Sequence, residues 1–254
     1  MPLTFPVFIP LGPWVVHPHF FFETLAYVVG FRLYLRRRRQ RGDYLEDGAR
    51  WSVVTAAAVG AVVGSRLLFW VEDPAATLSH LEHPLVLIGG KSIVGALVGG
   101  WIAVEIVKRW IGVTEATGDL FAVPLAVGIG IGRIGCFLSG LPDGTYGTAT
   151  SLPWGIDLGD GVARHPTALY ESVFALALAF VLARIGPRAR LGDVFKLFMA
   201  AYLTFRLLVE GLKPGVSLAL GLTAIQWVCV GGLAYYAWWL TRRNRIVTSA
   251  VQEV

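Results

Sequence analysis

Charged residues inside apolar segments are the part of this sequence best suited to chemistry. Arg133 lies in the glycine-rich run 130–135, and Arg206 and Glu210 lie four residues apart in a later apolar segment. A charge at the centre of a bilayer costs at least about 2.5 kcal/mol, so such residues are retained where they have a partner or a ligand. Because a guanidinium group can donate two parallel hydrogen bonds to one phosphate, the arginines favour a phosphate-containing ligand.

Positive charges outnumber negative charges among the residues of this kind that lie toward the outer half or the middle of the apolar segments. The set comprises Glu23, Arg66, Lys91, Arg133, Glu171, Arg206 and Glu210. Internal ion pairing would therefore leave one cation over, and a bound phosphate would supply the missing anion. The alternative is a network of buried ion pairs that only fixes helix register, with Arg206 and Glu210 as an i, i+4 pair.

Composition places these charges in a polytopic membrane protein. Hydrophobic residues make up 55% of the 254 residues and charged residues 15%, and the mean hydropathy is +0.62. A membrane-spanning helix needs about 20 apolar residues. The segments that qualify are 20–35, 51–71, 85–107, 119–138, 168–184, 194–212 and 218–240. The sequence thus predicts an all-α fold, a single domain over residues 1–254 with about seven transmembrane helices and an outer polar loop.

Lysine and arginine residues in the connecting loops predict the orientation of the bundle. On one side lie Arg36, Arg37, Arg38, Arg39, Arg41, Arg50, Lys108, Arg109, Arg184, Arg188, Arg190, Arg242, Arg243 and Arg245. The opposite side carries only Arg164 and Lys213. This asymmetry predicts an external N-terminus and a cytoplasmic C-terminus. The net charge of +5 is explained by orientation and by anionic membrane lipids, and no nucleic-acid partner is indicated.

The glycine patterns indicate helix packing and not a nucleotide site. The run 130–135 matches G-x-G-x-x-G, but it lies inside a predicted span and lacks the strand and the later acidic residue of a dinucleotide fold. Small-xxx-small spacings let membrane helices approach closely. Such pairs occur at Gly60/Gly64, Gly95/Gly99 and Gly128/Gly132.

No cofactor or metal site is predicted from the cysteines and histidines. Cys136 and Cys229 are interpreted as small buried residues, since two cysteines cannot make a disulfide framework. The histidine pairs are interpreted as solvated or hydrogen-bonded imidazoles on short outer loops. These pairs are His17/His19 and His80/His83.

An ordered set of motifs resembles the bacterial prolipoprotein diacylglyceryl transferases. The main segments are Gly132-Arg133-Ile134-Gly135, Tyr146-Gly147, Leu152-Pro153-Trp154-Gly155, Arg164-His165-Pro166-Thr167 and Leu169-Tyr170-Glu171. Further matches are Gly64-Ser65-Arg66-Leu67, Gly89-Gly90-Lys91-Ser92, Phe205-Arg206 with Glu210, and Gln226. The resemblance covers most of the chain in order. It implies a multi-pass protein of the bacterial inner membrane with seven spans and an external N-terminus.

The resemblance also implies a reaction and roles for residues. The family transfers the diacylglyceryl group of phosphatidylglycerol to the lipobox cysteine in the signal peptide of an exported prolipoprotein. Displacement of a phosphate leaving group by a thiolate needs cations on the phosphate and a route for the thiol proton. Membrane lipids and prolipoproteins are therefore the expected partners. We expect catalytic roles for Arg206, Glu23, His165 and Glu210, and substrate-binding roles for Arg133, Arg66, Lys91, Arg164 and Tyr170.

Departures from the family pattern concern proton transfer. Val94 replaces the histidine of a His-Gly-Gly motif, Cys136 replaces an asparagine and Leu141 replaces an acidic residue. Glu23, near the position of the usual tyrosine, or His165 could accept the thiol proton instead, although Glu23 could equally be the countercharge of an arginine. Two alternatives to the transferase stay open: a diverged paralogue with another acceptor, and a non-catalytic phospholipid-binding membrane protein.

Overall fold

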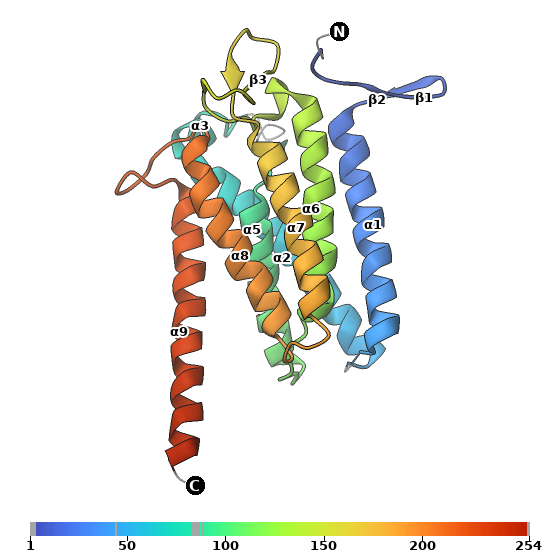
Figure 1. The fold of residues 1–254 in the computed structure, drawn as a ribbon, viewed down its shortest axis with the longest axis vertical. Coiled ribbons are helices and arrows are strands. Elements are labelled where there is room, and N and C mark those ends of the chain that lie inside the picture. Colours follow the sequence, from blue (N-terminus) through green and yellow to red (C-terminus); the bar gives the residue numbers. More distant parts are fainter. Residues whose placement is uncertain (1–3, 44, 83–86, 88, 253–254) are drawn as a thin grey trace. The chain divides into compact units, whose positions relative to one another are not determined.

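Long helices dominate the structure, a computed structural model that describes residues 4–43, 45–82, 87 and 89–252 (Figure 1). The chain divides into two compact units, each assembled from two separate stretches. The first unit comprises Met1–Tyr44 and Ala116–Pro214, and the second comprises Leu45–Glu115 and Gly215–Val254. The helical class predicted from the sequence is confirmed.

In the first unit, helix α6 contacts three other helices. The four are α1 (Pro18–Arg41), α6 (Asp119–Ser139), α7 (Thr167–Ile185) and α8 (Asp193–Val209). Short elements complete the unit: β1 (Ile9–Leu11), β2 (Trp14–Val16), β3 (Ile156–Asp157), β4 (Ala163–Arg164) and the 3-10 turns η1 (Leu141–Asp143) and η2 (Glu210–Leu212). Strands β1 and β2 form one antiparallel pair and β3 and β4 another. The sequence did not predict these hairpins, because two or three residues are too few to show strand alternation.

Asp119, at the start of α6, also fixes the start of α8. Its Oδ2 accepts a hydrogen bond from the backbone N–H of Gly192 (2.7 Å), and its Oδ1 accepts one from Phe195 (2.9 Å). The first amides of a helix have no partner within the helix, and a carboxylate there also complements the helix dipole. The contact therefore joins the first turns of the two helices that carry Arg133 and Arg206.

The second unit packs its helices through glycine and aromatic contacts. It comprises α2 (Asp47–Glu72), α3 (Pro74–Ser79), α5 (Ile93–Trp110) and α9 (Ala224–Gln252). Helix α2 lies along α5, and α9 touches both. Trp101 of α5 contacts Tyr235 and Tyr236 of α9, with ring centroids 4.9 and 5.8 Å apart.

Two glycine pairs bring the backbones of α2 and α5 into contact. A Cβ atom on Gly60 would lie 2.5 Å from the carbonyl oxygen of Gly99, and one on Gly64 would overlap the carbonyl oxygen of Gly95. No side chain larger than hydrogen fits at such an approach. The interpretation of these two pairs as packing motifs is confirmed.

The third predicted pair, Gly128 and Gly132 of α6, meets a looser surface. A Cβ atom at either position would lie 3.6 Å or more from Ala26 of α1, which is an ordinary contact. The tight positions on α6 are Gly130, where a Cβ atom would lie 2.7 Å from Cγ of Leu176 on α7, and Gly135, where it would lie 2.7 Å from Cβ of Phe22 on α1. Close packing in this helix therefore occurs at glycines other than the two that the spacing selected.

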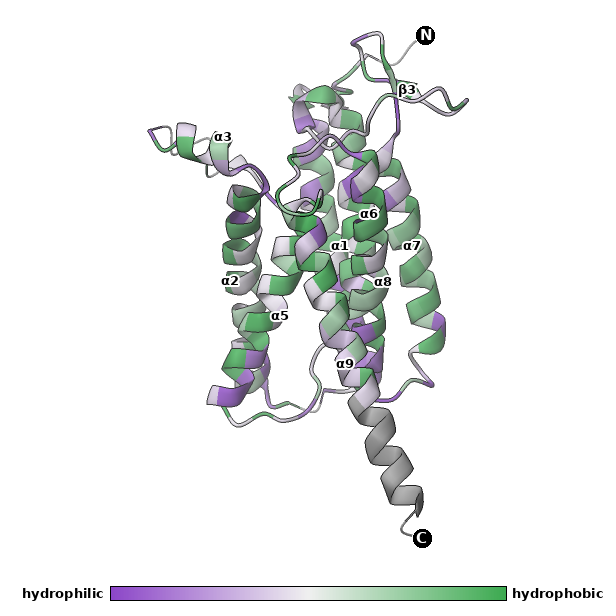
Figure 2. Ribbon diagram, turned by 90° about the vertical axis from the view of Figure 1, so that its left-hand side faces the viewer, coloured by the Kyte–Doolittle hydropathy of each residue, from purple (hydrophilic) through white to green (hydrophobic). Residues whose placement is uncertain are grey.

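Helices overlap all seven segments predicted to cross the membrane. Three of the described helices, α2, α6 and α7, are long and apolar enough to span a bilayer. Hydrophobic residues cover most of α6 and α7 (Figure 2). Large apolar side chains on α7 are exposed, Val173 by 68% and Phe180 by 59%, as expected of a surface that faces lipid. Membrane character is thus supported, and the count of seven spans stays a prediction.

One predicted span begins later than its hydropathy suggests. Helix α5 begins at Ile93 and not near residue 85, so Lys91 precedes the helix. The chain is not helical at Gly90, Lys91 and Ser92, and glycine is a poor helix former, which explains why α5 starts only at Ile93. Residues 85, 86 and 88 of the predicted span lie outside the described residues.

The other boundary differences are at α8 and α9. Helix α8 ends at Val209, so Glu210 belongs to the turn η2 and not to the helix itself. Helix α9 begins at Ala224, later than the predicted residue 218. Its start is fixed by a capping box: Gln226 N donates to Thr223 Oγ1 (3.2 Å), and Thr223 N donates to Gln226 Oε1 (3.0 Å).

Candidate functional site

Glu171 is the centre of a buried polar cluster in the first unit. It lies near the start of α7 and is fully buried. Its Oε2 lies 2.9 Å from Nε of Arg133 and 3.2 Å from Nη1 of Arg206, and its Oε1 accepts a hydrogen bond of 2.5 Å from the hydroxyl of Tyr202. Arg206 also pairs with Glu210 through Nη2 and Oε2, 2.7 Å apart. Helices α6, α7, α8 and the turn η2 thus meet at one carboxylate.

The cluster changes the charge balance inferred from the sequence. The sequence left open whether Arg133 and Arg206 bind a phosphate or form ion pairs, and the structure pairs both with Glu171 and pairs Arg206 with Glu210 as well. Two guanidinium groups and two carboxylates leave no excess charge among these four residues. Both arginines touch the same carboxylate oxygen, so they lie as close together as one phosphate would require.

Two buried donors in the cluster, Nε of Arg206 and Nε of Arg133, make no hydrogen bond of regular geometry among the described residues, although Nε of Arg133 lies 2.9 Å from Glu171 as an ion pair. The Nε atom of Arg206 is buried and makes no hydrogen bond there. Buried donors are rarely left unsatisfied, and each costs about 1–3 kcal/mol when it is. The position of this N–H beside a second arginine therefore suits an additional acceptor, such as an oxygen of a phosphate.

Lys213 is a neighbour of the cluster that the sequence-based reasoning treated only as a loop cation. Burial, together with the positive charges of Arg206 and Arg133, lowers the pKa of its amine to about 7. The carboxylates of Glu171 and Glu210 act in the opposite direction. An amine with such a pKa can gain or lose a proton near neutral pH. The sequence offered one indication that Lys213 lies near the cluster, namely its position three residues after Glu210.

The polar loop after α6 carries Arg164 and His165 and brings His165 to Tyr170 in the first turn of α7. Tyr170 accepts a hydrogen bond from the indole N–H of Trp154 (2.8 Å), and its hydroxyl lies 3.3 Å from Nδ1 of His165. Arg164 pairs with Asp160 (2.6 Å). This salt bridge and the hydrogen bond within it raise the pKa of the Arg164 guanidinium. The loop and the first turn of α7 therefore carry three of the predicted site residues.

A cavity lies beneath this loop. Its walls include Cys136, Tyr146, Arg164, His165 and Thr167. Arg133 and Arg206 are not among its lining residues. The cavity therefore connects the polar loop with Cys136, near the end of α6.

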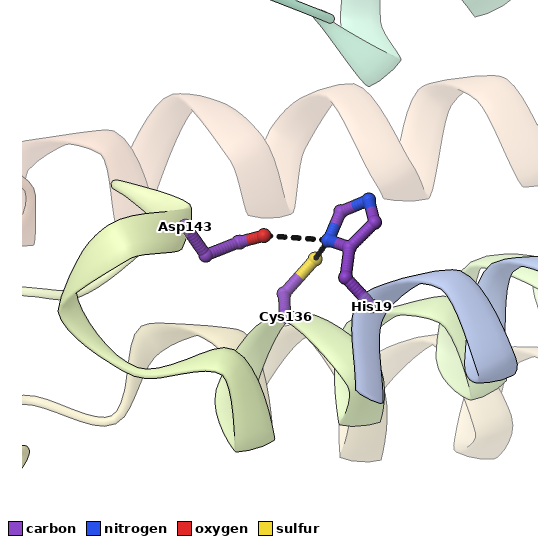
Figure 3. A group of neighbouring side chains, drawn as sticks. All are labelled: His19, Cys136 and Asp143. Carbon is purple, nitrogen blue, oxygen red and sulfur yellow. Dashed lines mark hydrogen bonds and ion pairs between the residues drawn. The ribbon is translucent and has the colours of Figure 1, made fainter. Parts of the chain in front are cut away.

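A second polar group surrounds Cys136. This cysteine is half-buried, so its interpretation as a small buried residue was wrong. Figure 3 shows Cys136 and Asp143 converging on the imidazole of His19. Nδ1 of His19 lies 2.5 Å from Oδ1 of Asp143 and 4.0 Å from Sγ of Cys136. Arg133 donates a hydrogen bond to the same sulfur (3.6 Å). Cys136 thus lies between the buried cluster and the outer surface.

The hydrogen bond between His19 and Asp143 stabilises the charged form of each. Hydrogen bonds to Asp143 and Cys136 raise the pKa of His19 to about 10, more than burial lowers it. Burial raises the pKa of Asp143, but hydrogen bonds from His19 and Thr145 outweigh it, so the pKa is lowered overall. Asp143 is the one acidic residue of the sequence between Asp119 and Asp157. Its being the one carboxylate in this stretch was the feature of the sequence that could have indicated its pairing with a histidine.

Glu23 lies on α1 beside this second group. Its Oε2 is 3.6 Å from Nε2 of His19, and its Oε1 accepts a hydrogen bond from Tyr27 (3.3 Å). The Glu23 side chain is 28% exposed, so it is a residue of the rim and not a buried carboxyl group. Its role as a proton acceptor stays a prediction.

Arg66 and Lys91 belong to the second unit. Nη1 of Arg66 donates a hydrogen bond to the carbonyl oxygen of Gly90, and Lys91 is exposed. Val94, at the position of the family histidine, is buried and cannot move a proton. The roles of Arg66 and Lys91 in substrate binding stay predictions.

Comparison with known proteins agrees with the motifs that lie in this site. The family described as prolipoprotein diacylglyceryl transferase matches residues 6–242. A phosphatidylglycerol–prolipoprotein diacylglyceryl transferase of Geobacter sulfurreducens is 38% identical over 223 residues, 81% of this chain and 80% of the relative. Proteins of the same name from Polaromonas naphthalenivorans (30% identical; 94% and 96% covered) and Trichormus variabilis (31%; 94% and 91%) are also similar. By both measures, this chain belongs to the prolipoprotein diacylglyceryl transferase family.

Proposed function

We propose that this protein transfers the diacylglyceryl group of phosphatidylglycerol to the lipobox cysteine of exported prolipoproteins. The observation that carries the proposal is the pairing of Arg133 and Arg206, both in family motifs, on the single carboxylate of Glu171. The family match over residues 6–242 supports the same activity. We place the reaction in one integral-membrane domain that covers the whole chain.

The buried cluster would act on the phosphate of the lipid. Arg133 and Arg206 are held in place by Glu171, so their N–H groups are oriented before the substrate arrives. When the thiolate attacks the glyceryl carbon, the carbon–oxygen bond to the phosphate breaks and negative charge develops on the leaving phosphate. Guanidinium groups close to that oxygen stabilise this charge more than they stabilise the intact lipid.

Lys213 would supply the positive charge that the cluster itself lacks. The four ion-paired residues are neutral together, so a phosphodiester anion would add an uncompensated charge. An amine with a pKa of about 7 takes up a proton when an anion binds nearby, because the anion favours the charged form. Glu210 would position Arg206 for this purpose.

The acceptor thiol would enter through the cavity beneath the polar loop. Arg164 and Tyr170 would bind the substrate there, and His165, which lines the cavity, is placed to accept the thiol proton. Glu23 is the second candidate for that proton because it lies on the rim beside His19. Arg66 and Lys91 would bind the lipid headgroup.

The reaction requires the polar loop to face the side from which exported substrates arrive. We therefore propose an inner-membrane protein with seven spans, an external N-terminus and a cytoplasmic C-terminus. A reporter fused after residue 245 should be cytoplasmic, and one inserted in the loop 141–163 should be external. The opposite pattern would remove the site from its substrates and contradict the proposal.

Substitution of Arg133 by lysine tests the proposed phosphate contact. Purified Arg133→Lys should lose roughly 10- to 100-fold of transfer from phosphatidylglycerol to a lipobox peptide, since charged hydrogen bonds contribute about 1.5–3 kcal/mol. Mass spectrometry of the peptide measures the product. Arg109→Lys, an exposed position of α5, is the matched control and should leave transfer unchanged. Near-normal transfer by Arg133→Lys would mean that Arg133 is only a countercharge.

A non-catalytic phospholipid-binding protein is the second candidate, and buried Val94 at the family's histidine position favours it. Wild-type protein that binds phosphatidylglycerol but modifies no lipobox peptide would support this candidate. Gain of transfer in Val94→His would support it further. Modification of a different thiol substrate by the wild type would instead indicate a paralogue with another acceptor.

A further inference from the structure

Three different metal-ligating side chains converge at the outer end of the first unit. They are His19 from the start of α1, Cys136 from the last turns of α6 and Asp143 from η1 (Figure 3). The imidazole nitrogen, the sulfur and a carboxylate oxygen all lie within 4.8 Å of one another. Three separate segments thus bring one ligand atom each to a common point.

Two separations of these atoms lie on either side of those in a tetrahedral zinc site. With zinc bonds of about 2.0–2.3 Å, neighbouring ligand atoms lie roughly 3.3–3.7 Å apart. The distance from Nδ1 of His19 to Sγ of Cys136 is 4.0 Å, and the distance to Oδ1 of Asp143 is 2.5 Å. Ångström-scale shifts would adjust both distances, and the shorter one would widen as an ion replaced the shared proton.

We propose that His19, Cys136 and Asp143 bind one Zn²⁺ ion, whose fourth position takes the thiol of the acceptor cysteine. The proposed thiol activation rests on the proposed transferase function, whereas the metal site itself does not. Three protein ligands with an open fourth position are the pattern of zinc sites that act on substrates. Imidazole and thiolate ligands also favour zinc over magnesium or calcium.

Charges around the three ligands suit a divalent cation. The carboxylate of Glu23 lies 3.6 Å from the other nitrogen of His19, and it adds negative charge beside that of Asp143. Arg133 approaches the sulfur of Cys136 to 3.6 Å, but its own charge is already matched by Glu171. An N–H donor at that distance would stabilise a ligating thiolate from outside the metal site.

Zinc at this point would replace the proton acceptor that the chain lacks at Val94. A thiol with an ordinary pKa near 8.5 is mostly protonated at neutral pH, but coordination to zinc removes its proton. The acceptor thiol would bind the ion and release its proton to His165, which lines the same cavity as Cys136. Its sulfur would then form a bond to the glyceryl carbon while the carbon–oxygen bond breaks and the electron pair leaves with glycerol phosphate. The uncharged thioether is a weak ligand and would leave the ion.

The position of Cys136 connects this metal site with the cavity. Cys136 is part of the cavity wall together with Arg164 and His165, so a thiol that enters the cavity reaches one of the three proposed ligands. On the other side Cys136 touches Arg133, which belongs to the proposed phosphate site. An ion here would thus lie between the thiol and the phosphate, where the transfer takes place.

Cobalt titration tests the metal site without reference to activity. Addition of Co²⁺ to the purified full chain should give a saturable thiolate-to-cobalt charge-transfer band at one ion per chain, and Zn²⁺ should displace it. The band should vanish in Cys136→Asn, which carries the family's own residue, and His19→Gln should bind the ion roughly 100-fold more weakly or worse. Cys229→Ser and His17→Asn are the matched controls and should titrate as wild type. No saturable band, or one that survives Cys136→Asn, would overturn the proposal.

The role of the ion in transfer is tested separately. A lipobox peptide should increase the cobalt charge-transfer band by adding a second thiolate, and a peptide with serine in place of its cysteine should not. Protein stripped of metal by a chelator should lose transfer and recover it with Zn²⁺. Full transfer by the stripped protein would overturn the role of the ion and leave the proposed function intact. Cobalt binding by a protein that transfers nothing would overturn the proposed function and leave the metal site intact.

Discussion

The two units of this protein differ in the contacts that dominate between their helices. In the second unit, α2 and α5 meet through the backbones of Gly60, Gly64, Gly95 and Gly99. In the first unit, α6, α7 and α8 meet at the buried carboxylate of Glu171. Glycine contacts depend on shape alone, whereas the Glu171 cluster depends on charges that are stable only while all partners are present. The first arrangement builds a scaffold, and the second builds a site.

Removal of the charge of Glu171 should give the largest effect. Glu171→Gln leaves Arg133 without its carboxylate and removes one of the two partners of Arg206, and breaking a buried pair costs about 3–5 kcal/mol of unfolding free energy. Reversible unfolding in mixed micelles measures the loss, and transfer activity should disappear with it. The control is Glu105→Gln, because Glu105 pairs with Lys108 at a position where the Glu105 side chain is 44% exposed. Equal losses in the two variants would contradict the contrast between the units.

Steric disruption of the glycine contact should give the next largest effect. Gly64→Val would push a branched side chain into the backbone of Gly95, and overpacking of this kind typically costs about 1–3 kcal/mol. The matched control is Gly128→Ala, where the added Cβ atom would meet Ala26 only at 3.6 Å. A Gly64→Val variant that unfolds like wild type would show that α2 and α5 can separate without loss.

Lys213 should give a smaller effect whose sign depends on pH. Its pKa is lowered from 10.5 to about 7 in the folded protein, so the unfolded chain binds more protons between these values. Wild-type stability should therefore rise with pH across this window, and the penalty is fully present below pH 7. Lys213→Met should raise the midpoint of thermal unfolding most below pH 7, with a gain that fades toward pH 10.5. A gain independent of pH would contradict the lowered pKa.

The capping box of α9 should give the smallest effect. Thr223→Ala removes the hydroxyl that accepts a hydrogen bond from Gln226 N, which typically costs about 1 kcal/mol. Thr204→Ala is the control, because the exposed Thr204 hydroxyl bonds only to Ala200 of its own helix. Reversible unfolding compares the two, and a larger loss in Thr204→Ala would contradict the assignment of the cap.

The sequence predicted the parts of this fold that depend on neighbours along the chain. Hydropathy located the helices, and i, i+4 spacing identified both the glycine pairs of α2 and α5 and the pair of Arg206 with Glu210. The start of α9 was missed although Thr223 and Gln226 have the spacing of a capping box. The error arose because the apolar residues before Thr223 were taken as part of the helix.

Contacts between distant segments could not be predicted in the same way. The bond between Glu171 and Arg133 joins two helices, and the approach of His19 to Asp143 joins residues 124 positions apart. Spacing in one sequence does not say which carboxylate reaches which cation. Cys136 was misjudged for a related reason, because its apolar surroundings along the chain say nothing of the imidazole that faces it.

The contact of Asp119 with Gly192 and Phe195 has a mechanical consequence for the arginines of the site. It fastens α6 to α8 at the ends remote from the cavity, and the shared bond to Glu171 fastens them again further along. Two attachments at different heights oppose sliding and rotation of the two helices past each other. The separation of Arg133 and Arg206 is therefore expected to be set by the protein and to change little when a lipid binds.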